Sequence, residues 1–141
     1  MSSVCSSCTD RRWWHFVPSL LVWAGITWLS LVKEVPVPLM AEVPLADKWG
    51  HMLAYFVFAL ILADDCYRAH LSTPAIYLWA ILLPIAYGGL IELIQPHFPP
   101  RQGEWLDWAA DCIGVVIGVV LFLLYHLWDT RRKSRQQRTA L

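Results

Sequence analysis

The side chains in this sequence that are able to do acid–base or ligand chemistry occur in three short segments. They are Asp47, Lys48, His51 and Tyr55 in the first segment, Glu92 and Gln95 in the second, and Arg101, Asp107 and Asp111 in the third. A histidine beside carboxylates can act as a general base, and a cationic side chain beside them can hold an anionic group. The chemistry that this set can do depends on whether the three segments meet.

Spacing within the segments favours such a meeting. Asp47, His51 and Tyr55 recur every four residues, so a helix aligns them in one stripe. Asp107 and Asp111 follow the same rule, and the two polar residues of the second segment are one turn apart. We therefore expect the three faces to share one pocket, capped by the loop that carries Arg101.

The elements that position these residues are predicted to be membrane-spanning helices. Hydrophobic residues make up 57% of the 141-residue chain, which is more than a soluble core of this size buries. A span needs about 20 apolar residues. Four stretches approach this length, at about 14–32, 48–63, 75–94 and 106–128. We predict an all-α polytopic membrane protein with four transmembrane helices in a bundle, preceded by an N-terminal segment (1–13) and followed by a basic tail (129–141).

Basic residues predict the orientation of the bundle, because lysine and arginine in short loops resist translocation. Of the eleven basic residues, two precede the first span, one (Arg68) follows the second, and five lie in the tail. Only Lys33, Lys48 and Arg101 fall on the other side. Both termini are therefore expected in the cytoplasm. The polar segments then all lie at the extracytoplasmic surface.

Small residues in the last two spans indicate close helix packing. Gly114 and Gly118 form a G-x-x-x-G face on the fourth span, nearly in line with Asp107 and Asp111. We expect them to pack against another helix, and a homo-oligomer is one way to supply it. In the third span, Pro84 precedes a Gly-Gly pair and is expected to kink the helix or admit a neighbour.

Several other classes of function are disfavoured. The formal net charge of zero gives no basic field for nucleic acid. Cys5 and Cys8 lack a second ligand pair for structural zinc, whereas Cys66, at an expected cytoplasmic turn, and Cys112, in an apolar helix, are expected to be reduced thiols.

A metal version of the site also has little support in the sequence. It would use His51, Glu92, Asp107 and Asp111, which include one histidine and no H-E-x-x-H spacing. We therefore expect neither a metal nor another cofactor.

Taken with their spacing, these motifs resemble the VanZ-like membrane protein family, named for a teicoplanin-resistance protein. The matching segments are D-K-W-G-H-M-L-A-Y (47–55), E-L-I-Q (92–95), P-P-R (99–101) and D-W-A-A-D-C-I-G-V-V-I-G (107–118), within about 46–121. The resemblance implies a four-helix protein of the bacterial inner membrane, linked in some members to tolerance of a lipoglycopeptide antibiotic and without a generally agreed reaction. Family members often carry Asn where this chain has Asp111.

Two functions account for the polar residues. The first is binding of an amphiphile's head group, such as that of a phospholipid, a lipid-linked cell-wall precursor or a lipopeptide drug, through Lys48, His51 and Arg101. The alternative is an intramembrane hydrolase or transferase acting on such a lipid, with His51 as general base oriented by Asp47, and Glu92 or Asp111 as partner acid.

A purely structural interpretation is that Asp47 and Asp107 cap helices and Arg101 ties the loop to them. It explains less well His51, Glu92 and Asp111, which lie a turn deeper. A transporter is disfavoured because no polar stripe continues past the outer turns, although an oligomer would change that.

Overall fold

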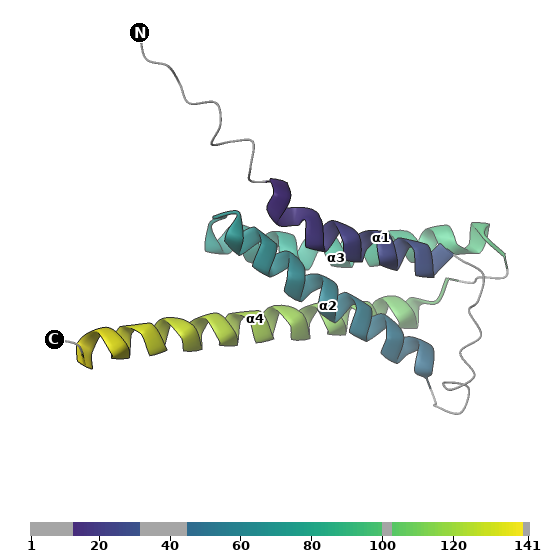
Figure 1. The fold of residues 1–141 in the computed structure, drawn as a ribbon. Helices are drawn as coiled ribbons and strands as arrows, with labels where there is room; N and C mark the ends of the chain where they lie inside the picture. Colours follow the sequence, from purple (N-terminus) through teal and green to yellow (C-terminus); the bar gives the residue numbers. More distant parts are fainter. Residues whose placement is uncertain (1–12, 32–44, 100–102, 140–141) are drawn as a thin grey trace, which may run out of the picture.

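The computed structural model of the chain describes residues 13–31, 45–99 and 103–139, and their regular structure is entirely helical (Figure 1). Within these ranges there is no strand, as predicted. The elements, in chain order, are η1 (Trp13–Phe16), α1 (Val17–Leu31), α2 (Ala46–Arg68), α3 (Thr73–Ile94), η3 (Gln95–His97) and α4 (Trp105–Thr139).

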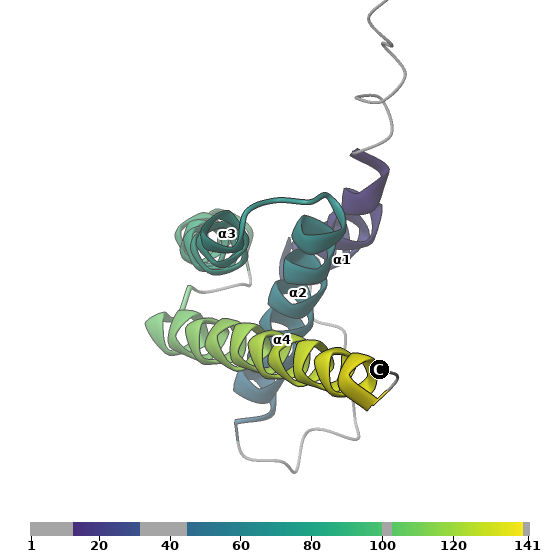
Figure 2. The same ribbon diagram turned by 90° about the vertical axis from the view of Figure 1, so that its left-hand side faces the viewer.

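Successive helices run in opposite directions, with α2 at the centre. In Figure 1, α1 and α3 run one way and α2 and α4 the other. Seen along the bundle in Figure 2, α2 lies between the other three helices, and it packs most extensively against α4. The start of α2, the end of α3 and the start of α4 consequently meet at the same end of the bundle.

Among the described residues, four helical segments are long and apolar enough to cross a membrane, which agrees with the predicted number of spans. They are Trp13–Leu31, Ala46–Arg68, Thr73–His97 and Trp105–Arg138. Large apolar side chains cover the outside of the bundle. Leu21 and Leu106, for example, are 69% and 66% exposed. Such a surface needs lipid around it, because a water-soluble protein of this size rarely exposes so much contiguous apolar area.

The second helix is longer than predicted, and the polar turn after it is shorter. The sequence predicted a helix ending near residue 63, but α2 continues through Asp64 and Asp65 to Arg68. Asp64 forms an i,i+4 ion pair with Arg68, while Asp65 is 2% exposed and accepts a hydrogen bond from the backbone N–H of Ser19 at 3.0 Å. The carboxylate of Asp65 therefore satisfies one of the free N–H groups in the first turn of α1.

Helix α2 ends in a Schellman motif. His70 has a φ of 58°, its N–H donates to the carbonyl of Tyr67 at 2.9 Å, and the N–H of Leu71 donates to that of Cys66 at 3.1 Å. Cys66, predicted at a turn, thus lies in the last turns of α2 and is 1% exposed. The prediction for Cys66 was wrong because α2 continues through the polar residues that follow Ala63, and the turn begins only after Arg68.

The fourth helix also outruns its prediction. It was expected to end near Trp128, with residues 129–141 as a separate tail, but α4 continues to Thr139. Lysine, arginine and glutamine are good helix formers, and Asp129 and Lys133 form an i,i+4 ion pair at 2.7 Å. Hydropathy marks where a span leaves lipid, whereas the helix itself continues as long as its residues favour it.

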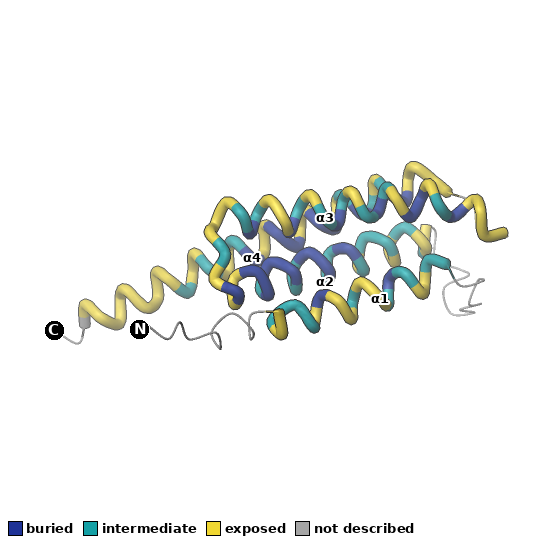
Figure 3. The backbone as a smooth tube through the Cα atoms, turned by 90° about the horizontal axis from the view of Figure 1, so that it is seen from above, coloured by how far each residue is buried: buried dark blue, intermediate teal, exposed yellow. Residues whose placement is uncertain are grey.

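The G-x-x-x-G face of α4 packs directly on the backbone of α2, as predicted. A Cβ atom at Gly114 would collide with the carbonyl oxygen of Met52, and one at Gly118 would lie 2.6 Å from that of Phe56. Only glycine permits so close an approach. Figure 3 shows that buried positions run along much of α2, the central helix of the bundle.

Candidate functional site

Three helices bring the predicted polar residues together at one end of the bundle. The first turns of α2 carry Asp47, Lys48, His51 and Tyr55. The end of α3 carries Glu92, and η3 carries Gln95. The start of α4 carries Asp107 and Asp111. Arg101 lies outside the described residues, so its predicted contacts with the carboxylates stay predictions.

His51 and Asp111 form the centre of this polar cluster. Nδ1 of His51 lies 3.1 Å from Oδ1 of Asp111, and Asp111 is 1% exposed. On the other side of the ring, Nε2 lies 3.9 Å from Oδ2 of Asp107, which is beyond hydrogen-bond distance. The imidazole is therefore held by one buried carboxylate and faces a second.

This arrangement corrects the predicted partner of His51. The sequence favoured Asp47, one turn away on the same helix, as the orienting acid. Asp47 instead pairs with Lys48 at 3.1 Å and is exposed, whereas Asp111 reaches the ring from the facing helix. Residues four apart on a helix share a face, but that face points toward α4, whose side chains come closer to the ring.

Lys48 draws three carboxylates together. Its Nζ atom lies 3.1 Å from Asp47, 2.9 Å from Glu104 and 2.8 Å from Asp107. With its three N–H donors used on these partners, the ammonium group would have to give up one of them to hold an anionic head group. The sequence had counted Lys48 among the groups for such an anion, and that role stays a prediction.

Glu92 joins the end of α3 to the start of α4. Its Oε2 atom accepts the backbone N–H of Glu104 at 2.7 Å, while Oε1 is buried and has no hydrogen-bond partner among the described residues. Gly103 makes the contact possible, because a Cβ atom there would overlap the carbonyl oxygen of Glu92. The predicted place of Glu92 in the shared cluster is thus consistent with the geometry.

A tryptophan and a glycine close the cluster on the α3 side. Trp108 packs on Gly88 and Gly89 and donates from Nε1 to the carbonyl of Ile85 at 3.0 Å. A Cβ atom at Gly88 would lie 2.8 Å from Oδ2 of Asp111. The glycine pair, predicted to kink α3 or admit a neighbour, therefore admits α4 with its acid.

A cavity of about 270 Å³ opens beside the cluster, on the side facing α1. Its polar wall includes His51, Tyr55 and Gln95, and its apolar wall includes Ile26 and Leu29. The amide nitrogen of Gln95 donates to the carbonyl of Ser30 at 3.3 Å, which links the end of α3 to that of α1. Tyr55 is 2% exposed, and its hydroxyl oxygen has no partner in the described part of the chain.

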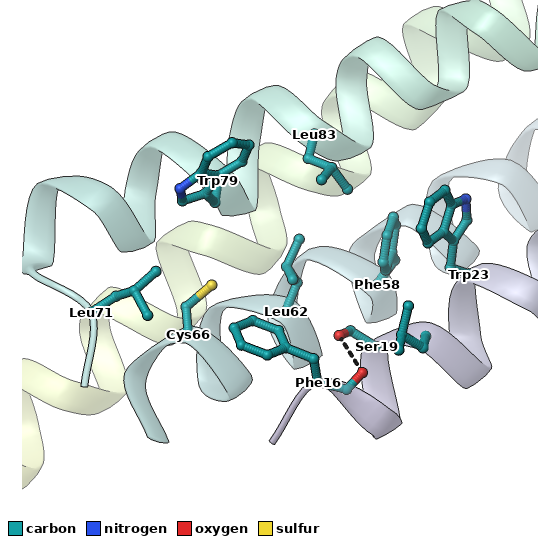
Figure 4. A pocket seen from close by; sticks show the side chains of 10 residues that line it. Phe16, Ser19, Trp23, Phe58, Leu62, Cys66, Leu71, Trp79 and Leu83 are labelled. Carbon is teal, nitrogen blue, oxygen red and sulfur yellow. Dashed lines mark hydrogen bonds between the residues drawn. The ribbon is translucent and has the colours of Figure 1, made fainter. Parts of the chain in front are cut away.

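A second cavity, of about 300 Å³, lies nearer the opposite end of the bundle and is almost wholly apolar (Figure 4). Side chains from η1, α1, α2 and α3 line it, among them Phe16, Leu62 and Trp79. The hydroxyl of Ser19 donates to the carbonyl of Phe16 at 3.1 Å and so does not face the cavity unpaired. The thiol of Cys66 also lines this cavity.

Sequence reasoning missed Glu104 and Trp108. Glu104 was passed over as part of a loop, although acidic residues at the start of an apolar run are typical of a helix N-terminus. Trp108 entered the sequence analysis only as a letter of the motif at 107–118. Nothing in the sequence marked it as the residue that covers the Gly88–Gly89 pair.

The chemistry open to this cluster follows from its charges. Five carboxylates (Asp47, Glu92, Glu104, Asp107 and Asp111) surround Lys48 and His51. The described part of the site is therefore suited to accepting hydrogen bonds from hydroxyl or ammonium groups or to holding a cation, and His51 is suited to moving a proton. His51, Glu92 and Asp107 each offer an atom within 4.8 Å of the others.

Comparisons of the chain with known protein families, with curated proteins and with solved structures give no match. The function must therefore be argued from the site.

Proposed function

We propose that the chain is a VanZ-like protein of the bacterial inner membrane that binds the polar head group of an amphiphile of the cell envelope. Both termini would lie in the cytoplasm, so that the polar cluster faces outward. The ligand is proposed to be a membrane lipid or a lipid-linked cell-wall precursor. The spaced motifs of α2, α3 and α4 and the charge of the loops support this proposal.

The cavity beside the cluster is the observation that carries the proposal. One wall is polar, with His51, Tyr55 and Gln95, and the other is apolar, with Ile26 and Leu29 from α1. An amphiphile is divided in the same way, since its head group is polar and its hydrocarbon chain is apolar. The nearby carboxylates accept hydrogen bonds, so hydroxyl and amino groups are the parts of a head group that they would recognise, while the buried hydroxyl of Tyr55 can donate or accept.

The test is a mass-spectrometric inventory of the lipids that co-purify with the wild type, with Tyr55→Phe and with Tyr87→Phe. Tyr55→Phe removes only the unpartnered hydroxyl, and the retained head-group class is expected to fall about tenfold, since a hydrogen bond to a buried partner is worth about 1–1.5 kcal/mol. Tyr87 bonds to Thr27 at 2.6 Å away from the cavity, so Tyr87→Phe is the matched control.

Equal retention by all three proteins would argue against binding in this cavity. Growth of cells in teicoplanin, with and without each variant, tests the further link to lipoglycopeptide tolerance. Tolerance lost in Tyr55→Phe and kept in Tyr87→Phe is the result expected if the link holds.

One observation favours the alternative, an intramembrane hydrolase or transferase. His51 lines the cavity, and its Nδ1 atom is held at 3.1 Å by the buried Asp111, as in a general base with an orienting acid. Its Nε2 atom would take the proton of an attacking water or hydroxyl group. Turnover of a lipid or lipid-linked substrate by the purified protein, abolished in His51→Gln, would support this function. Retention of the ligand without turnover would favour binding.

A further inference from the structure

We propose that His51, Glu92 and Asp107 form a binding site for one divalent transition-metal ion, with Asp111 holding His51 from behind. This goes beyond head-group binding and does not depend on it. The three residues come from α2, α3 and α4, so the ion would tie the three helices together at the end of the bundle.

The distances between the three side chains suit a shared ion. One ligand atom of each residue lies within 4.8 Å of those of the other two. Nε2 of His51 and Oδ2 of Asp107 are 3.9 Å apart, too far for a hydrogen bond. Two atoms that each bind one ion at about 2.0–2.2 Å lie about 3–4.2 Å from each other. The observed separation falls in this range.

Asp111 provides the support that a ligating histidine usually has. Its Oδ1 atom lies 3.1 Å from Nδ1 of His51 and is placed to accept that N–H. This contact leaves the lone pair on Nε2, the nitrogen that faces Asp107. Ligating histidines in proteins commonly donate their other N–H to a carboxylate, which fixes the ring and its tautomer.

An unpartnered buried oxygen points independently to a ligand. Glu92 is 5% exposed, and its Oε1 atom has no partner among the described residues, although Oε2 is bonded to the N–H of Glu104. A buried polar atom without a partner is unfavourable by about 1–3 kcal/mol, and more when it is charged. A cation beside Glu92, Asp107 and Asp111 would also offset the repulsion among three carboxylates.

A neighbouring group of acids provides a contrast. Asp47, Glu104 and Asp107 also offer atoms within 4.8 Å of one another, but Nζ of Lys48 lies 2.8–3.1 Å from all three and already supplies their positive charge. Asp107 takes part in both groups through different oxygens, with Oδ1 on Lys48 and Oδ2 toward His51. The cation site is therefore assigned to the histidine side.

The ligand set indicates the class of metal. One imidazole nitrogen with two carboxylate oxygens suits Zn²⁺ or Mn²⁺, whereas Mg²⁺ and Ca²⁺ favour oxygen ligands alone. The sequence predicted no metal because it lacks two histidines on one helix. That criterion does not apply to ligands contributed by three separate helices.

The proposal is tested with the full-length protein in detergent, stripped with a chelator and dialysed against ZnCl₂ or MnCl₂. Elemental analysis is expected to give one ion per chain. Glu92→Gln and His51→Gln are expected to lower the affinity at least tenfold. Asp47→Asn removes a carboxylate one turn away, from the group around Lys48, and is expected to leave the affinity unchanged.

Three results would overturn the proposal. One is the absence of stoichiometric uptake by the wild type. Another is loss of uptake in Asp47→Asn with full uptake in His51→Gln, which would assign the ion to the other acids. X-ray absorption of the loaded wild type provides a test that needs no variant to fold, because the proposed site requires one imidazole among its ligands. A spectrum without imidazole would also refute it.

Discussion

His51 and Asp111 are 60 residues apart in the sequence, yet Nδ1 of the histidine lies 3.1 Å from Oδ1 of the aspartate, between α2 and α4. Asp111 is 1% exposed, so the carboxylate side of this contact is buried. One turn further along α4, Gly114 lets the backbones of the same two helices come into contact. This polar contact thus lies beside a close crossing of α2 and α4, and the crossing fixes the distance between imidazole and carboxylate.

The first prediction is that His51 and Asp111 are energetically coupled. In a double-mutant cycle of His51→Ala, Asp111→Ala and the double variant, we expect a coupling of about 1–3 kcal/mol in the free energy of unfolding, because each single change leaves a buried polar partner without its contact. Reversible unfolding in mixed detergent and denaturant measures it. Additive effects of the two changes would contradict the contact.

Asp111→Asn refines this prediction. The asparagine side chain has the shape of aspartate and keeps one acceptor oxygen for the N–H of His51, so it is expected to destabilise the protein less than Asp111→Ala does. A larger loss in Asp111→Asn than in Asp111→Ala would mean that Nδ1 of His51 is not the donor in this contact.

The second prediction concerns the glycines of α4. Gly114→Ala is expected to lower the free energy of unfolding by about 1–3 kcal/mol or more, because the added methyl group would overlap the carbonyl oxygen of Met52 and force α2 and α4 apart. Gly25→Ala is the matched control. No described atom lies within 4 Å of a Cβ there, so this change should be neutral or stabilise α1 by about 0.5–1 kcal/mol.

Thermal unfolding of both variants in the same detergent measures this difference. A Gly114→Ala protein as stable as Gly25→Ala would show that the close crossing of α2 and α4 is not required.

Features decided by local interactions could be predicted from the sequence, whereas features decided by long-range contacts could not. Hydropathy predicted four spans, and the four-residue spacing of Asp47, His51 and Tyr55 predicted which of them share a face, since both are local properties of a helix. Asp65 was misassigned to a turn because its burial depends on the N–H of Ser19, 46 residues away. Glu104 was missed for a similar reason, since only the fold brings it to Lys48.

The third prediction is the orientation of the bundle. In a protein with its natural cysteines replaced by serine, Phe98→Cys is expected to react with a membrane-impermeant maleimide on intact spheroplasts, because η3 and the residue after it lie at the end that the charge pattern places outside. Gln136→Cys, in the exposed end of α4, is expected to react only after the membrane is opened. Phe98 is itself 47% exposed, so access should not limit its labelling. The reverse pattern would place the polar cluster in the cytoplasm.

The last prediction is that Tyr55→Phe makes the ligand-free protein more stable. The hydroxyl of Tyr55 is buried without a partner among the described residues, and a buried polar group in that state is unfavourable by about 1–3 kcal/mol. Removing it at nearly constant volume should therefore raise the melting temperature of delipidated protein. Tyr87→Phe should lower it, because the hydroxyl of Tyr87 bonds to Thr27 at 2.6 Å.

Adding back the lipid that co-purifies with the wild type distinguishes two roles of the Tyr55 hydroxyl. It either binds the ligand or is a buried group that has no partner at all. A ligand that bonds to the hydroxyl binds the wild type more tightly than Tyr55→Phe and therefore stabilises the wild type more, so the advantage of Tyr55→Phe should shrink or reverse as lipid is added. If both proteins gain the same stability from lipid, the hydroxyl does not contact the ligand. If Tyr55→Phe is less stable than the wild type even without lipid, the hydroxyl already has a partner within the protein.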